Sequence, residues 1–568
     1  MIPTLPQDDP AVQARRDALA EAREEYVFDR SVSDCLFAET VPLRDKGSPR
    51  YWAELAEANV RCTANKAATS QPREVAESIV GKLEGLAARL KATRVAEHLD
   101  ELKSAVGVDT DYPVSSPDDF RRAFELIEAP VAAEHWQRDD YFAWMALAGP
   151  NPTLLQRLTS VPDHLGLTEA CFGCVSDDLS LADALAAGRV YIADYHMLAG
   201  AEGGVVDEYQ KYICAPIAVY LATDTGLTPV GIQLGQAATD LFAQPGDGTT
   251  WSMAKTALLA ADSQLTGLVG HFGLCHLVME AVVLSMKRNL AEPHPLRKLL
   301  DAHTQDTLIV NDITRSSLTP VNGTIDRMMA QPREASLHMV ATAVRNFRLL
   351  ESAPPQDFAR RGVDDTEALP VYPWRDDQLL LWEATEAWIR TYVETYYRSD
   401  DEVSLDEELQ AFTVELEGNE LGGMQGIGRV TTRDEVVDLV ARIVFRATVF
   451  HAGINYSLYD TGYAPFQPQA QFGPGPTGDD DTHEAWMRMM PPYDIAYEVV
   501  EAFYPLHVRI NTLGDYGSYL TDPAVADALA AYQSALRDIE ATIETRNAER
   551  AFPYCQSLPS RISNSIHV

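Results

Sequence analysis

Two short segments of the chain hold side chains that could share one metal ion. His271 and His276 lie in His-Phe-Gly-Leu-Cys-His, and His451 and Asn455 lie in His-Ala-Gly-Ile-Asn. Imidazole nitrogens and an amide oxygen suit a redox-active first-row ion such as iron or manganese, whereas thiolates would favour zinc. The chain has 13 histidines, so some close pairs arise by chance, and spacing alone leaves both interpretations open.

The spacing within each pair predicts the backbone that must carry it. Residues four apart lie about 40° from each other around an α-helix, so His451 and Asn455 can reach one ion from a regular helix. Residues five apart lie about 140° from each other, so His271 and His276 cannot. A π-helical turn, closed by i→i+5 hydrogen bonds, brings both rings to one face, and such turns concentrate at functional sites. The sequence therefore predicts a π-helical turn at the first pair.

Long helices are expected around both pairs. Residues 251–290 form an apolar run without proline, and two prolines follow it closely. A second helical run covers about 433–458. Apolar residues at helical spacing also predict helices within 10–30 and 72–106, near the start of the chain.

A small β region is expected between these helical parts. Residues 189–196, 212–221 and 230–234 are short runs rich in β-branched and aromatic residues, bounded by Gly, Pro and Asp. The Pro-, Gly- and Asp-rich stretch 460–482 predicts a loop. No repeat or linker-like change of composition is visible, so the fold class is mainly α, with one catalytic unit and a small β region.

The charge of the chain limits its partners. The 46 Lys and Arg residues against 84 Asp and Glu residues give a formal net charge of −38. Such a surface repels nucleic acids and anionic membranes, so we expect no nucleic-acid partner and at most transient membrane association. We see no signal peptide and no uncharged apolar run of membrane-spanning length, so a cytoplasmic protein is expected. The sequence assigns no oligomeric state.

The cysteines do not form a recognisable framework. There are seven, an odd and scattered set, which argues against a disulfide scaffold. Cys171 and Cys174 make one Cys-x-x-Cys pair, but no second pair or nearby His-x-x-x-His accompanies it. Chance spacing is favoured over a zinc or redox site.

The segment around the first histidine pair resembles the lipoxygenase family. The chain has 17 residues between His276 and His294 and eight between His294 and His303, the intervals of that family's central motif. The motif further includes Trp251-Ser-Met-Ala-Lys255, Asp262, Arg288, Leu290, His294-Pro295 and Lys298-Leu-Leu300. Other similar blocks are Asn311, Arg315, Ser317-Leu318, Asn322-Gly323, Asp140-Tyr-Phe142, Ala148-Gly-Pro-Asn-Pro152, Gly188 to His196, Asn564-Ser-Ile566 and Val568. The resemblance covers roughly residues 135 to 568.

The resemblance implies a site and a domain division. Its metal ligands would be His271, His276, His451, Asn455 and the terminal carboxylate of Val568. The metal would be one non-haem iron; manganese stays open, because one manganese-using branch also ends in Val. Residues 131–568 would be the large helical catalytic domain of the family. Residues 1–130 are expected to be a helical section packed on it, as in compact bacterial members, instead of a β-barrel; we hypothesise that this section covers the mouth of the substrate pocket.

The implied substrates are O₂ and a polyunsaturated fatty acid of the linoleic or arachidonic type. A redox-active metal would remove a hydrogen atom from a bis-allylic carbon, and O₂ would add to the resulting radical to give a hydroperoxide. The family places Phe272, Thr314, Leu318 and Ile325 in the substrate pocket, although bulky aliphatic residues also serve ordinary core packing. Because the protein is acidic, apolar contacts must hold such a ligand.

Several positions depart from the family pattern. Thr266 stands where a third, non-ligating His is usual. Gly267 and Leu458 replace polar residues, commonly Gln, that link the metal site to the pocket. Thr314 replaces the Ala or Gly that correlates with the handedness of oxygenation, so regio- and stereospecificity stay unassigned. Lys287 and Arg288 are basic but carry little weight as carboxylate-binding residues.

Two alternatives remain beside the dioxygenase. The first is a fatty-acid hydroperoxide isomerase on the same fold, motivated by Thr314 and the missing polar link. It would consume hydroperoxide without net O₂ uptake. The second is a non-catalytic, metal-free fatty-acid-binding protein, against which the complete set of metal-ligand side chains argues.

Overall fold

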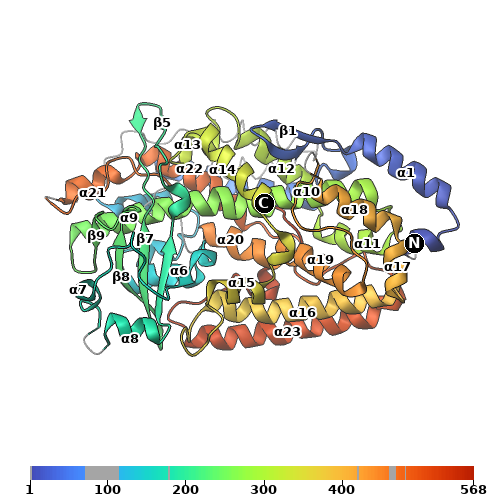
Figure 1. Cartoon of the computed structure of the whole chain (residues 1–568). Helices are drawn as coiled ribbons and strands as arrows, with labels where there is room; N and C mark the ends of the chain where they lie inside the picture. Colours follow the sequence, from blue (N-terminus) through green and yellow to red (C-terminus); the bar gives the residue numbers. More distant parts are fainter. Residues whose placement is uncertain (1–2, 71–113, 177–178, 419–420, 460–468, 480) are drawn as a thin grey trace.

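The structure is a computed structural model that describes residues 3–70, 114–176, 179–418, 421–459, 469–479 and 481–568. Its centre is one continuous helix of 41 residues that runs from Thr249 to Asn289 (Figure 1). The helix is α9 (Thr249–Gln264), the π-helix η7 (Leu265–Leu277) and α10 (Val278–Asn289). It is apolar enough to cross a membrane, but 72% of its most apolar window is buried inside the fold, as expected of a core helix. The predicted helix and its π-helical turn are both confirmed.

A second interrupted helix lies against the first. It consists of α19 (Arg433–Phe445), a shorter π-helix η9 (Arg446–Phe450) and α20 (His451–Ser457). Thr432 begins it with a capping box, in which its hydroxyl accepts from the Glu435 amide and the Glu435 carboxylate accepts from the Thr432 amide. The helical run predicted for 433–458 is therefore present, but η9 was not anticipated.

Further helices surround this pair, and their starts follow from local sequence. At the start of α11 (Pro295–His303), the side chain of His294 accepts a hydrogen bond from the Leu296 amide, and Pro295 occupies the first turn, where its missing N–H costs nothing. The other helices that position the site are α12 (Thr307–Ser317), α13 (Thr324–Met328), α14 (Arg333–Asn346), α16 (Pro373–Tyr396), α18 (Glu407–Glu417), α22 (Tyr493–Phe503), the short η11 (Tyr504–His507) and α23 (Ala526–Glu549).

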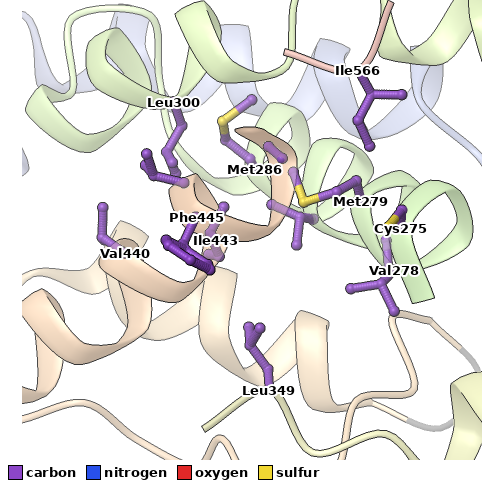
Figure 2. Close-up of a cluster of buried hydrophobic side chains, with 14 of the residues drawn as sticks. Cys275, Val278, Met279, Met286, Leu300, Leu349, Val440, Ile443, Phe445 and Ile566 are labelled. Carbon is purple, nitrogen blue, oxygen red and sulfur yellow. The ribbon is translucent and has the colours of Figure 1, made fainter. Parts of the chain in front are cut away.

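The main hydrophobic core lies between the two interrupted helices. Figure 2 shows part of it, where side chains of the central helix meet those of α19 and of the C-terminal segment. The labelled members are Cys275, Val278, Met279, Met286, Leu300, Leu349, Val440, Ile443, Phe445 and Ile566. All are at least nine-tenths buried, which leaves the two ligand-bearing segments little freedom to move apart.

The β region is a five-stranded antiparallel sheet in the order β3-β4-β7-β8-β9. Its strands are β3 (Gln156–Arg157), β4 (Val190–Asp194), β7 (Ile217–Thr223), β8 (Gly226–Gln233) and β9 (Phe242–Ala243). The three predicted strands correspond to β4, β7 and β8. The middle one was predicted to begin at Tyr212 but begins at Ile217, directly after Pro216, which cannot donate to a strand ladder. A small separate hairpin joins β5 (Val205–Val206) to β6 (Tyr209–Gln210).

The N-terminal section is not wholly helical, contrary to the prediction. Between α1 (Val12–Glu25) and α2 (Pro49–Ser70), a hairpin joins β1 (Phe28–Val32) to β2 (Cys35–Ala38). Ser33 and Asp34 turn it with φ of 47° and 67°, the pattern of a type I′ turn. A Ser-Asp pair lacks the usual Asn-Gly signal, which explains the error. The helix predicted for 72–106 lies outside the described residues.

The N-terminal elements pack directly on the catalytic helices. Helix α1 contacts α10, and β2 contacts α10, α12 and α14. Cys35, Leu36 and Phe37 of β2 belong to the same buried cluster as the central helix. The hairpin is thus part of the core.

Candidate metal centre

Three histidines converge where the two interrupted helices meet. The Nε2 atoms of His271 and His276 lie 3.2 Å apart. One ring nitrogen from each of His271, His276 and His451 lies within 4.8 Å of the others. Among the described residues this is the one group of three or more His, Cys, Asp or Glu side chains placed to hold a metal ion.

The π-helix η7 makes this convergence possible. It extends over 13 residues, which is far longer than the single turn that the spacing required. The i→i+5 bonding brings His271 and His276 to one side, although a regular α-helix would point them about 140° apart. His451 is the first residue of α20, directly after η9, so each ligand-bearing segment adjoins or lies within a π-helix.

Burial keeps all three imidazoles neutral. It lowers the pKa of His276 to about 4, and it holds the pKa values of His271 and His451 well below their usual range. The neighbouring histidines add to this effect at His271 and His451, because a second positive charge would be repelled. Neutral imidazole is the form that binds metals.

Two buried polar atoms at the centre favour a cation between the rings. His451 Nε2 and Asn455 Oδ1 are buried, and neither makes a hydrogen bond within the described part of the chain. The Asn455 amide nitrogen is held by the Leu506 carbonyl at 2.8 Å, and its oxygen lies close enough to His271 to raise the pKa of that ring. Unpaired buried acceptors are costly, and a metal ion would satisfy them. The donor set therefore fits a metal.

Val568 lies beside the three histidines. One of its main-chain groups hydrogen-bonds to His451, and the residue is 8% exposed and lines the cavity beside the histidines. The structure thus brings together all five residues that the resemblance implied as ligands.

The far side of His276 is fixed by a hydrogen-bonded chain. The Asn311 amide nitrogen donates to the His276 carbonyl at 3.1 Å and to Glu280 Oε2 at 2.7 Å, so its oxygen must be the group that meets His276 Nδ1 at 2.8 Å. His276 Nδ1 is then the protonated nitrogen, and Nε2 keeps a free lone pair. The other Glu280 oxygen accepts from the Ala38 amide at 2.6 Å, which ties the N-terminal hairpin to this network. Sequence reasoning missed Glu280, which lies four residues after His276.

A cavity of about 540 Å³ opens beside the histidines, a volume typical of small-molecule sites. All four predicted pocket residues line it: Phe272, Thr314, Leu318 and Ile325. Apart from the C-terminal carboxylate of Val568, Glu501 is the only acidic group that the described residues place in its wall, and Lys66 pairs with it at 2.9 Å.

The N-terminal section forms one wall of this cavity. Four residues of α2 contribute to it, namely Tyr51, Trp52, Leu55 and Asn59. No sequence signal had assigned these residues to the pocket. This places part of the section against the cavity, while the hypothesis that the section covers the mouth of the substrate pocket stays a prediction.

Two of the departures from the family pattern, Gly267 and Leu458, lie in the cavity wall. A β-carbon at Gly267 would meet the Met329 methyl carbon at 2.8 Å, so Met329 already occupies the space that a longer side chain would need. The apolar Met329 side chain thus lies where the family usually has a polar link. Because both polar residues of that link are absent, neither position holds a side-chain amide without a partner.

Other candidate groups have structural roles. Lys287 pairs with Asp45 at 3.1 Å and Asp301 at 3.4 Å, and Arg288 pairs with Glu415 at 2.7 Å. These basic residues are engaged away from the cavity wall.

The thiols of Cys171 and Cys174 do not join the histidine cluster. Both are free cysteines, and Cys174 is exposed. Cys171 Sγ lies 3.1 Å from the Thr168 hydroxyl. Chance spacing remains the favoured interpretation of this pair.

Comparison with known proteins agrees with the geometry. A family model described as Lipoxygenase matches residues 124–556. Linoleate 9/13-lipoxygenase of Pseudomonas aeruginosa is 35% identical over 477 residues, which are 79% of this chain and 69% of that protein. Hydroperoxide isomerase ALOXE3 of Homo sapiens is 30% identical over 468 residues, 79% of this chain and 65% of that protein. The match therefore spans about two thirds of the length of these relatives.

Solved structures show the same fold. A coral 8R-lipoxygenase superposes with a TM-score of 0.85 at 25% identity, over 100% of this chain and 83% of its own. A manganese lipoxygenase superposes with a TM-score of 0.80 over the whole of both chains; at 19% identity, this likeness shows the fold alone.

Proposed function

Because this chain belongs to the lipoxygenase family of dioxygenases, we propose that it inserts O₂ into polyunsaturated fatty acids of the linoleic or arachidonic type to give hydroperoxides. The observation that carries the proposal is the group of three neutral histidines, with His276 and His451 buried and His271 half-buried, beside a largely apolar cavity. Such a cavity accepts an acyl chain, and the histidines bring a redox-active metal to its side.

The proposed metal ligands are the three histidines, Asn455 Oδ1 and the carboxylate of Val568. Iron is the proposed ion, and manganese suits the same nitrogen and oxygen donors. When bound, the ion supplies a one-electron acceptor that allows the weak C–H bond between two cis double bonds to be broken.

The protein's own residues then hold and shield the substrate. Phe272, Leu318 and Ile325 present apolar surface to the acyl chain and exclude water from it. Asn311 keeps the proton of His276 on Nδ1, away from the metal position. Glu501 gives a free fatty-acid carboxylate no attraction, so apolar contacts must supply most of the affinity.

O₂ uptake by the purified, metal-analysed protein tests this proposal. On addition of linoleic or arachidonic acid, we expect O₂ consumption with parallel growth of conjugated-diene absorbance. Absence of both, in protein with a full complement of iron or manganese, would contradict it.

A second candidate is hydroperoxide isomerisation on the same site. The specific observation is the apolar Gly267–Met329–Leu458 wall where a polar link is usual, together with the similarity to a hydroperoxide isomerase at 30% identity. This activity would consume a fatty-acid hydroperoxide without net O₂ uptake, which distinguishes it from the first. The third possibility, a metal-free fatty-acid carrier, is disfavoured by the histidine triad and would require metal-free protein as isolated.

A further inference from the structure

Arg446 is a buried arginine next to the metal centre. It is the first residue of η9 and is 5% exposed. Its guanidinium carbon lies 4.3 Å from the ring centroids of both Phe347 and Phe450, so the group is held between two aromatic faces. Within the described residues, no carboxylate forms an ion pair with it. A buried charge without such a partner is costly, so its position requires an explanation.

The guanidinium makes one hydrogen bond to the central helix. Arg446 Nη1 donates to the Leu274 carbonyl at 2.9 Å. Leu274 lies three residues after His271 and two before His276, near the end of η7. Two π-helices are thus joined through one side chain.

Where the π-helix changes to an α-helix, the Leu274 carbonyl is expected to lack a main-chain N–H partner. The Val278 amide bonds back five residues to the Gly273 carbonyl, as in a π-helix, and also three residues to the Cys275 carbonyl, but not to Leu274. From α10 onward, amides bond back four residues, so the next amide, that of Met279, reaches the Cys275 carbonyl. The Leu274 carbonyl between them receives no main-chain N–H in this scheme. Leu274 is half-buried, and Arg446 supplies the donor that its carbonyl lacks in this scheme.

We propose that Arg446 is a positioning residue, which fixes the point where the π-helix returns to an α-helix and thereby sets the orientation of His271 and His276. If the donor were lost, an α-helical register could extend toward the ligands and satisfy the carbonyl, turning the two rings away from each other. The inference rests on the proposed function only for its kinetic readout.

Arginine suits this position better than other donors. Its planar guanidinium stacks on aromatic rings with its face and donates hydrogen bonds in its plane at the same time. The pKa of Arg446 is lowered to about 10 by burial, so the group remains charged at neutral pH.

Arg442 offers a matched control on the same helix, one turn earlier. It is 3% exposed, and its guanidinium carbon lies 5.7 Å from the ring centroid of Trp382. It donates to the Asp438 carbonyl and to Gln356 Oε1, and unlike Arg446 it forms an ion pair with a carboxylate, that of Asp438. In the described structure it makes no bond to η7, so it shares the burial and the stacking but not the proposed role.

The test compares Arg446→Ala, Arg446→Lys and Arg442→Ala in metal-loaded full-length protein. We expect Arg446→Ala to change the electron paramagnetic resonance spectrum of the metal and to lower kcat about ten- to a hundredfold, with KM within about twofold. Millimolar guanidinium should restore both, by filling the space between the rings. Arg446→Lys, which keeps one donor, should lie between wild type and Arg446→Ala.

A readout without metal separates this inference from the proposed function. In metal-free protein, amide hydrogen exchange in residues 274–280 should be faster in Arg446→Ala than in wild type, and unchanged in Arg442→Ala. A normal metal spectrum in Arg446→Ala, or the same spectral change in Arg442→Ala, would overturn the proposal even if no fatty acid were oxidised. If all variants keep normal spectra and exchange but show no O₂ uptake, both the proposed function and the positioning role of Arg446 are refuted.

Discussion

The two π-helices of this protein serve different purposes. The longer one, η7, has 13 residues and carries two candidate ligands at i,i+5 spacing, so the distortion is a condition for both rings to meet. The shorter one, η9, has five residues and carries no candidate ligand. The pair His451 and Asn455 lies after it in regular helix at i,i+4 spacing, where no distortion is needed. The same backbone feature thus orients ligands in one helix and, by our inference, places the Arg446 donor in the other.

The two segments also differ in how they are packed. A β-carbon at Gly453 in α20 would lie 2.3 Å from a ring carbon of Trp374, whereas one at Gly270 in η7 would have its nearest neighbour at 3.8 Å. At Gly453, tight packing therefore holds α20, whereas the part of η7 around Gly270 has more room and hydrogen bonds to Asn311 and Arg446 hold the segment that follows. We therefore expect mutations in α20 to act mainly through packing, and mutations at η7 to act mainly through the loss of ligands and hydrogen bonds.

The largest effect is expected from removal of a ligand in η7. His276→Ala should lose more than about a hundredfold in kcat and most of the bound metal, because outer partners of a ligand alone are worth ten- to a hundredfold. Asn455→Ala, in α20, should lose about tenfold, since a neutral amide oxygen is the weakest of the proposed donors. Metal content by mass spectrometry and O₂ uptake check both. Equal metal content in His276→Ala and wild type would refute the assignment.

Loss of the hydrogen bonds that support η7 should lower kcat nearly as much as loss of a ligand. Asn311→Leu removes the partner of His276 Nδ1 and leaves Glu280 with one fewer donor. We expect kcat to fall about ten- to a hundredfold with a smaller change in stability. Steady-state kinetics and urea unfolding measure the two quantities. A variant with wild-type kcat would show that the ring needs no such support.

Packing should dominate in α20. Gly453→Ala should destabilise the protein by about 1–3 kcal/mol, because the Trp374 ring cannot move aside freely. Gly270→Ala is the matched control and should change the free energy of unfolding by less than about 1 kcal/mol. Denaturant unfolding of both variants gives the comparison, and equal losses would contradict the packing difference.

The last prediction concerns a pH dependence of stability near η7, in a residue that is not a candidate ligand. Burial raises the pKa of Glu280 to about 8, from an ordinary value of 4.5. Between these values the folded protein holds more protons on this group than the unfolded chain, so its contribution is full below about pH 4.5 and is lost as the pH rises through about 8. Glu280→Gln should flatten this decline, changing the stability difference from wild type by more than about 1 kcal/mol between pH 5 and 8. Parallel stability curves in urea would be inconsistent with the raised pKa.

Sequence reasoning succeeded where a spacing rule constrains the backbone. The five-residue interval between His271 and His276 required a π-helical turn, and the short β-branched runs marked the strands β4, β7 and β8. The four predicted pocket residues line one cavity: η7 and α12 are in contact, Leu318 directly follows α12, and the Ile325 amide of α13 donates to the Leu318 carbonyl.

Sequence reasoning failed where no local rule of spacing or turn composition applies. The i,i+4 spacing of His451 and Asn455 fits a regular helix, so nothing marked η9. The hairpin at Ser33 and Asp34 adopts a turn that these residues favour weakly. The contribution of Tyr51 and other α2 residues to the cavity depends on tertiary packing across more than two hundred positions.

The measurement that tests the central claim most directly is anomalous X-ray diffraction from crystals of the metal-loaded protein, recorded at the absorption edge of the metal found by elemental analysis. We expect one anomalous peak among His271, His276 and His451, at about 2.0–2.3 Å from their Nε2 atoms. A peak at Cys171 and Cys174, or no peak among the three histidines in protein that contains stoichiometric metal, would contradict the account.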